Sequence, residues 1–224
     1  MQAGFSKIAA LLADPAREAM LMALADGRAL PAGELADAAG VTSQSASGHL
    51  RKLVEGGVVS VWPQGRFRYF RLADEQVASA LEALATVACS RPERVVPATA
   101  RSSPLATARC CYNHMAGRLG VALADAFVRR GYVRIARDEA ALTPTGLRWV
   151  EAVGVLIPKA KSNGSDRLRL CLDWTERRFH LAGAFPSAVL HHLLETGRLA
   201  RGEDRLLTVT QEGKIWFGAL GIEV

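Results

Sequence analysis

The sequence has few cysteines, few aromatic residues and no long apolar runs. Its four cysteines, two of them adjacent, do not resemble the framework of a secreted disulfide-rich protein. They contain no Cys-x-x-Cys pair, so no closed zinc ribbon is indicated. No apolar stretch is long enough to span a bilayer, and no signal peptide is evident. We therefore expect a cytoplasmic protein with reduced thiols and no membrane partner.

The sequence also lacks the usual signatures of catalysis. There is no ordered Ser, His and Asp set, no carboxylate pair and no phosphate-binding glycine loop. Asp173 and Glu176 near His180 are too little for a catalytic site, so we expect that the protein is not an enzyme. The chain does carry 28 basic against 22 acidic residues, a net charge of +6, which weakly favours a nucleic-acid partner.

The most specific feature is a helix–turn–helix pattern followed by a hairpin. A short helix over Glu34–Ala39 is expected to end at Gly40, and Thr42 or Ser43 can cap a second helix that runs to about Val54. The second helix has a narrow apolar stripe and a broad face of hydroxyl, amide and basic side chains. Such side chains suit base edges and phosphates in the major groove of DNA.

A basic hairpin completes this pattern. A turn at Pro63–Gly65 precedes a strand over Arg66–Leu72, where arginines alternate with aromatic residues. Beside a reading helix, such a wing can reach phosphates or the minor groove, although a merely solvated hairpin would show the same composition. The residues expected to contact DNA are Thr42, Ser43, Gln44, Ser45, Ser47, His49, Arg51, Lys52, Gln64, Arg66 and Arg68.

The first ninety residues resemble the ArsR/SmtB family of bacterial winged helix-turn-helix regulators. The matching segments are Leu12–Arg17, Leu24–Gly27, Glu34–Ala36, Ser47–Leu53, Gln64–Arg66 and Tyr69–Leu72. The resemblance implies a homodimeric repressor that leaves a palindromic DNA operator when an effector binds. It also implies that the dimer pairs through helices at Ser6–Met22 and Asp74–Cys89.

Two departures from the family matter. Gly48 stands where relatives often have arginine just before the histidine of the recognition helix, which removes a possible phosphate contact. The cysteine pair that some members carry before the turn is absent from Leu30–Ala36, and metal ligands on the dimer helix are not evident. The family's best-known metal sites are therefore not carried over, and we expect sensing in the rest of the chain.

Proline-rich and polar segments divide the chain. We expect a winged helix-turn-helix domain over 1–90, a linker over 91–107 that is rich in proline, and a C-terminal domain over 108–224. A polar loop separates this last domain into lobes 108–157 and 168–224. The overall fold class is mainly α with small β-hairpin wings (α+β).

The C-terminal domain is an internal duplication. His114–Gly117 recurs as His180–Gly183, and the Thr-x-x-Gly-x-x-Trp pattern that begins at Thr143 recurs from Thr210. We expect two similar helix–strand–helix lobes related by a pseudo-twofold axis. The repeated tryptophans are expected to anchor the core.

Cysteine and histidine residues recur near the repeated motif. If residues 110–114 are helical, either thiol of the adjacent cysteine pair shares a face with the histidine. We expect a pocket between the lobes whose candidate effector or metal residues are Cys110, Cys111, His114, Cys171, Asp173 and His180. Zinc would accept a Cys/His set, and a soft metal ion or metalloid would accept the thiols. A small organic ligand, or simple burial of the thiols, are alternatives.

These features predict an effector-responsive transcriptional regulator, but they leave the effector or cofactor unidentified. One alternative is a repressor that senses oxidants or electrophiles, since Arg109 can lower the pKa of the neighbouring thiols. Another is a DNA-binding protein without an effector. Sequence-specific protection of palindromic DNA would separate a regulator from this last class.

Overall fold

The computed structural model describes residues 4–65, 67–89, 103–136, 139–158, 168–203 and 205–224. It contains two compact units, Met1–Ala80 and Leu81–Val224. The division falls inside helix α5 (Glu75–Cys89), whereas the sequence placed the boundary at residue 90. Most of the expected linker lies outside the described residues. Within the described ranges, no helix is long and apolar enough to cross a membrane.

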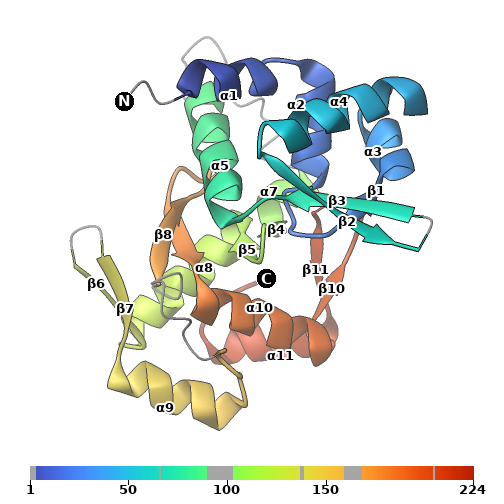
Figure 1. The fold of residues 1–224 in the computed structure, drawn as a ribbon. Coiled ribbons are helices and arrows are strands. Elements are labelled where there is room, and N and C mark those ends of the chain that lie inside the picture. The colour runs from blue at the N-terminus through green and yellow to red at the C-terminus, as the bar shows by residue number, and fades with distance from the viewer. Residues whose placement is uncertain (1–3, 66, 90–102, 137–138, 159–167, 204) are drawn as a thin grey trace. The chain divides into compact units, whose positions relative to one another are not determined.

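The first unit combines helices with a small antiparallel sheet of strand order β1–β3–β2 (Figure 1). Its elements are α1 (Phe5–Leu12), α2 (Pro15–Ala23), β1 (Leu30–Pro31), α3 (Ala32–Ala38), α4 (Ser43–Glu55), β2 (Val59–Gln64), β3 (Phe67–Leu72) and the start of α5. Gly40 adopts a φ of 62°, which lets the chain turn between α3 and α4 without a steric penalty. This arrangement confirms the expected winged helix-turn-helix.

The predicted single helix over Ser6–Met22 is wrong, because the chain breaks between α1 and α2. Asp14 is extended, and its carboxylate accepts the backbone N–H of Arg17 at 3.0 Å. Pro15 occupies the first turn of α2, where its missing N–H costs nothing but its ring blocks continuation from a preceding helix. The Asp-Pro pair is therefore a helix start.

The wing is tighter than the sequence suggested. β2 and β3 pair from Val59 opposite Leu72 to Gln64 opposite Phe67, so the connection consists of Gly65 and residue 66. Gly65 has a φ of 59°, and residue 66 lies outside the described residues. The expected turn at Pro63–Gly65 is corrected in one respect: Pro63 belongs to β2, an edge strand where a missing N–H is tolerated.

The second unit contains the same sequence of elements twice: hairpin, helix, hairpin, helix. The short helix α7 (Pro104–Thr107) precedes them. The first copy comprises β4 (Arg109–Cys111), β5 (His114–Ala116), α8 (Gly117–Arg129), β6 (Val133–Ala136), β7 (Glu139–Leu142) and α9 (Pro144–Val153). The second comprises β8 (Arg169–Leu172), β9 (Phe179–Ala182), α10 (Ala184–Glu195), β10 (Leu199–Arg201), β11 (Leu207–Val209) and α11 (Gln211–Ala219).

The duplication was predicted, but the helix–strand–helix description of each lobe was incomplete. It missed the first hairpin of each copy, and it gave one strand where the structure has two. These strands are three or four residues long, too short to show a clear two-residue alternation.

The repeated Thr-x-x-Gly motif is a helix start that also fixes the preceding hairpin. The hydroxyl of Thr143 accepts the N–H of Gly146 at 3.0 Å and thereby caps α9. A Cβ atom on Gly146 would overlap the carbonyl oxygen of Tyr132, so only glycine fits this approach. Thr210 and Gly213 repeat both features at the start of α11.

The two copies interlock around one apolar core. Helix α8 of the first copy contacts β9 of the second, and α10 of the second contacts β5 of the first (Figure 1). The core takes large side chains from both copies, including Phe127 and Phe217. The rings of Trp149 and Trp216 lie 6.1 Å apart, half-buried against this core. These equivalent residues of the two copies therefore meet in the shared core.

Candidate DNA-reading surface and a buried cysteine–histidine cluster

Helix α4 separates an apolar side from a polar side. Thr42 caps it by accepting the N–H of Ser45 at 3.2 Å. Ala46, Leu50 and Leu53 are fully buried and hold one side of the helix in the unit. Of the residues predicted to contact DNA on and next to α4, the structure leaves exposed Thr42, Ser43, Gln44, Ser45, Ser47, Arg51 and Lys52. α4 thus presents hydrogen-bonding groups to solvent over its whole length.

His49 is the exception among the polar residues predicted on α4. Its Nδ1 atom lies 3.5 Å from a carboxylate oxygen of Asp14 and 3.5 Å from the guanidinium of Arg17. The N–H bond from Arg17 and the nearby positive charges, opposed by some burial, lower the pKa of Asp14. His49 therefore ties α4 to the start of α2, and its ring is only partly available to DNA.

Gly48, the departure from the family pattern, is not imposed by packing. A Cβ atom at this position would meet nothing within 4 Å, and the residue lies inside α4. Glycine weakens a helix by about 1 kcal/mol relative to alanine. The missing side chain therefore lowers local stability without any structural gain within the described first unit.

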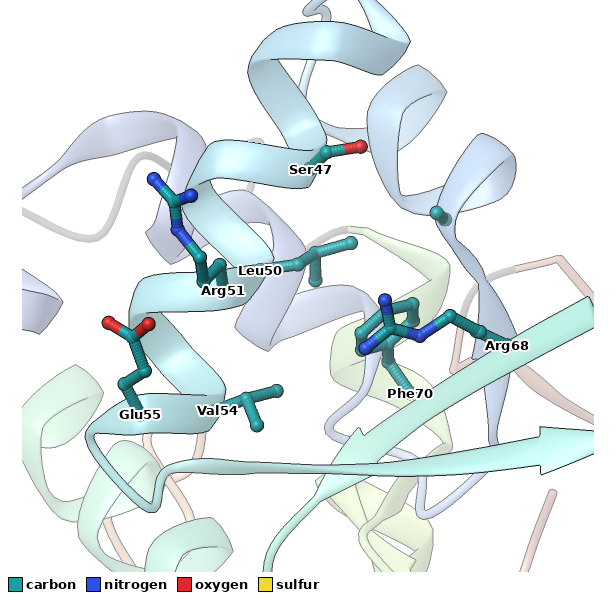
Figure 2. A pocket seen from close by; sticks show the side chains of 8 residues that line it. Ser47, Leu50, Arg51, Val54, Glu55, Arg68 and Phe70 are labelled. Atoms are coloured by element: carbon teal, nitrogen blue, oxygen red, sulfur yellow. The ribbon is translucent and has the colours of Figure 1, made fainter.

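A groove runs between α4 and the wing (Figure 2). It has a volume of about 520 Å³ and is lined by apolar, basic and acidic side chains. Arg68 projects from β3 into this space, with its guanidinium 5.7 Å from the centre of the Phe70 ring. Gln64 and Arg68 are exposed on the wing, whereas Arg66 lies outside the described residues. The wing and α4 thus offer polar groups on both sides of the groove.

In the second unit, residues 110–114 are not helical, so the condition under which Cys110 or Cys111 would share a helix face with His114 does not hold. These residues form the hairpin β4–β5, in which Cys111 lies opposite His114. In the second copy, Cys171 lies opposite His180 across β8–β9. Side chains alternate between the two faces of a strand, so Cys110 faces away from Cys111. Its thiol donates to the carbonyl oxygen of Tyr112 and packs in the apolar core.

The two hairpins bring four of the six predicted residues together. The candidate ligand atoms of Cys111, His114, Cys171 and His180 all lie within 4.8 Å of one another. All four side chains are buried, with exposed fractions from 0% for His180 to 9% for Cys171. The two imidazole ring centres are 5.1 Å apart. This cysteine–histidine cluster is made of equivalent residues from the two copies of the repeat.

The thiols of the cluster differ in acidity. A hydrogen bond with Cys111, aided by the imidazoles of His114 and His180 and opposed by burial, lowers the pKa of Cys171 far below the ordinary thiol value. The same bond, with burial, raises the pKa of Cys111. Cys171 is therefore the more acidic thiol of the pair, and the thiolate is the form that binds metals and attacks electrophiles.

Asp173 lies next to the cluster but belongs to a buried ion-pair network. It accepts hydrogen bonds from Arg109 at 3.0 Å and from the N–H of Gly117 at 2.7 Å. Although burial opposes ionisation, the charge of Arg109 and these bonds lower the pKa of Asp173 to about 2. The other carboxylate oxygen, Oδ1, accepts the hydroxyl of Thr175 at 2.6 Å, and Nδ1 of His180 lies 3.6 Å from Oδ2. Asp173 therefore orients the cluster from outside.

Glu82 on α5 extends this network, and few sequence features indicated its role. Its carboxylate receives a hydrogen bond from Arg205 at 2.9 Å and lies 3.6 Å from Arg109. All three side chains are buried. The one available signal was an acidic residue within an otherwise apolar helical turn, Leu81–Ala85. Through Glu82, the helix that follows the wing is joined to the surroundings of the cluster.

The sequence and fold are similar to those of known helix-turn-helix proteins. A helix-turn-helix domain family matches residues 12–61. The uncharacterized HTH-type transcriptional regulator YdfF from Bacillus subtilis (strain 168) is 37% identical over 218 residues, which cover 97% of this chain and 96% of that protein. The chain belongs to the helix-turn-helix transcriptional regulators. The resemblance of its first ninety residues to the ArsR/SmtB regulators is confirmed.

Other relatives of this regulator match a smaller part of it. The HTH-type transcriptional regulator CmtR from Mycobacterium tuberculosis (strain H37Rv) is 37% identical over 86 residues, 38% of this chain and 72% of that protein. A solved homodimeric winged helix-turn-helix domain, Mb0332 from Mycobacterium bovis, is 30% identical and covers 39% of this chain and 81% of its own, with a TM-score of 0.37. The match to YdfF thus includes the second unit, whereas the match to CmtR leaves most of the regulator uncovered.

Proposed function

We propose that this regulator is a cytoplasmic, homodimeric repressor that binds a palindromic operator and is released when an effector binds its second unit. The observation that carries the proposal is the polar face of α4, which is exposed along the helix and flanked by the wing. A reading helix in the major groove places such side chains against base edges.

The first unit offers distinct groups for reading sequence and for binding phosphates. Gln44 is exposed in the first turn of α4, and its amide can form two hydrogen bonds with an adenine edge. Arg51, Lys52 and Arg68 carry the positive charge that binds phosphates without regard to sequence. Specificity and salt-dependent affinity therefore depend on different residues.

Exposed apolar side chains support a dimer. Helix α1 buries none of its residues, and Phe5 and Ile8 are 76% and 38% exposed. On α5, Leu84 and Val87 are 49% and 61% exposed. α5 and most of α1 lie in the segments, Asp74–Cys89 and Ser6–Met22, through which the family resemblance implies pairing. Their burial against a second copy would account for large apolar side chains in solvent.

Helix α5 gives the second unit a physical connection to the wing. It starts three residues after β3 ends, at Glu75, and it carries Glu82 into the buried network with Arg109 and Arg205. Arg109 is in the same strand as Cys111. An effector that moves β4 would therefore act on α5, and it must favour one state by several kcal/mol to change operator occupancy strongly.

Selection of DNA fragments by the full-length protein tests the proposal. We expect enrichment of a palindrome whose half-sites lie about one helical turn apart. Binding without sequence preference would contradict a specific regulator and favour an effector-independent DNA-binding protein. Mass determination of the free protein should give the dimer, and a monomer that binds half-sites singly would contradict the homodimer.

A second candidate function is oxidant sensing, and one observation favours it. The sulfur atoms of Cys111 and Cys171 lie within 4.8 Å of each other. One molecule of hydrogen peroxide could oxidise the two thiols to a disulfide: the S–S bond forms, the O–O bond breaks, and the two thiol protons leave with the oxygens as two waters. If oxidation is the signal, peroxide should change the operator affinity of the wild-type protein. It should leave the operator affinity of Cys171→Ser unchanged.

A further inference from the structure

Each copy of the repeat contributes one cysteine and one histidine from the same place in its first hairpin. Cys111 and His114 are directly opposed across β4–β5, as are Cys171 and His180 across β8–β9. Opposed residues in antiparallel strands have their Cβ atoms about 4.5–5.5 Å apart. Strands β5 and β9 are in contact, so the two pairs face each other inside the second unit.

We propose that Cys111, His114, Cys171 and His180 bind one Zn²⁺ ion per chain, or a divalent ion of similar chemistry, in a closed tetrahedral site. The site itself depends only on the second unit. It rests on the proposed function in one respect, namely that this ion is the effector that the second unit senses.

The distances in the cluster suit a small tetrahedral ion. Zinc bonds of about 2.3 Å to sulfur and 2.0 Å to nitrogen put the four ligand atoms roughly 3.3–3.8 Å apart. In the protein the four candidate atoms lie within 4.8 Å of one another. Small side-chain rotations would close this gap, and the backbone of neither hairpin has to move far.

The surroundings orient both imidazoles for binding. Nδ1 of His114 lies within hydrogen-bond distance of the side-chain oxygen of Asn113, at 3.2 Å, whereas Nδ1 of His180 faces Asp173 at 3.6 Å, longer than a hydrogen bond. Histidines that bind metals usually donate their other ring N–H to an oxygen in this way, which leaves Nε2 for the ion. Asp173 is itself held by Arg109 and by the N–H of Gly117.

His180 is the strongest sign that a ligand belongs here. Its side chain is 0% exposed, and neither ring nitrogen has a hydrogen-bond partner of normal geometry among the described residues. A buried polar group without such a partner costs free energy, so native proteins rarely leave one. Packing of two cysteines as small apolar residues would explain the thiols. It would not explain two adjoining imidazoles in the same buried place.

The donor set also selects the class of ion. Two thiolates and two neutral imidazoles balance a divalent charge, which a buried site requires. The neighbouring Asp173 and Glu82 are matched by Arg109 and Arg205, so they add no net charge. Trivalent metalloids favour more thiolates, and Cys110 turns its thiol away from the cluster.

Metal counting on the full-length protein tests the site. Protein purified without a metal-affinity tag or chelator should retain one zinc ion per chain by native mass spectrometry. Replacement by Co²⁺ should give the intense visible bands of tetrahedral cobalt together with a thiolate charge-transfer band. Protein that takes up neither ion, or that is isolated with Cys111 and Cys171 joined in a disulfide and binds no ion after reduction, would overturn the proposal.

Matched variants separate ligation from folding. Cys171→Ser should lose the bound ion. Cys110→Ser changes the residue next to Cys111 in β4, whose thiol points away from the cluster, and this variant should keep the ion. Should Cys171→Ser fail to fold, His180→Cys provides a second route, because it should still bind cobalt and strengthen the thiolate band. Full metal content in Cys171→Ser, or an unchanged cobalt spectrum in His180→Cys, would contradict the site. None of these measurements requires DNA, so they can fail or succeed independently of operator binding.

Discussion

Most polar side chains of α4 in the first unit are exposed, whereas the second unit buries Arg109, Asp173 and His180 completely. An exposed polar group is satisfied by water until a partner replaces that water. A buried one must be satisfied by the protein or by something bound within it. The first pattern is suited to reading an external molecule, and the second to holding an internal one. Substitutions that disturb one pattern or the other test that contrast.

The largest effect is expected where a buried charge loses its partner. Arg109→Met removes the cation that faces Asp173 and Glu82, and we expect the second unit to lose about 3–5 kcal/mol of stability. Arg178 forms an ion pair with Asp125 at 2.8 Å, but the two side chains are 59% and 36% exposed, so water screens the pair. Arg178→Met should therefore cost about 1 kcal/mol or less. Urea unfolding followed by amide exchange would measure the loss of stability in both variants. An equal loss in Arg109→Met and Arg178→Met would refute the assigned network.

The next effect concerns sequence discrimination by the first unit. Gln44→Ala should reduce the preference for the cognate operator over a single-base variant by about 1–3 kcal/mol, because it removes a side chain that reads a base edge. Gln211→Ala removes the same chemistry from an exposed position at the start of α11 and should have no effect. Competition binding with the two DNA duplexes measures both variants. Unchanged discrimination in Gln44→Ala would mean that α4 does not read bases at this residue.

A smaller and non-specific effect is expected from the wing. Arg68→Ala should weaken binding to all DNA sequences alike. It should also reduce by about one the magnitude of the slope of log affinity against log salt concentration. Arg129→Ala removes an equal charge from an exposed site on α8 in the second unit and should leave the slope unchanged. Binding titrations over a range of salt concentrations would measure the slope for both variants. A normal slope for Arg68→Ala would remove Arg68 from the interface.

The smallest effect concerns the cap that starts α2. Asp14 has a folded pKa below its ordinary value of 3.8, mainly because it accepts the N–H of Arg17. Its stabilising contribution is therefore complete above pH 3.8 and disappears as the pH falls through the lower folded value. Asp14→Asn should lower the melting temperature of the first unit at pH 7 more than at the acid end of this range. A pH-independent difference would show that the charge of Asp14 contributes nothing.

Local signals explain what the sequence predicted well. Thr42, Gly40 and the apolar spacing of α4 are short-range patterns, and the structure places the recognition helix and the wing as they indicate. The repeat was evident because Thr143, Gly146 and their counterparts serve as helix caps and close contacts that few other residues can replace. The break at Pro15 was missed, although an Asp residue followed by Pro is a recognisable helix start.

The buried cluster was only partly predictable, for physical reasons. Strands as short as β4 and β5 have no clear periodicity, so Cys110 and Cys111 could not be assigned to opposite faces. Once the strand pairing is known, the alternation of side chains selects Cys111. The partnership of Glu82 with Arg205 joins residues 123 positions apart, which no local pattern reveals.

Operator affinity of zinc-loaded and zinc-stripped protein tests the central claim most directly, namely that the second unit binds an ion that controls DNA reading by the first. In anisotropy titrations at fixed salt, we predict at least a tenfold weaker affinity for the loaded form, a coupling of about 1.4 kcal/mol. Cys110→Ser should respond to zinc in the same way, and Cys171→Ser should not respond. Equal affinity of the two wild-type forms, or tighter binding by the loaded one, would contradict the account.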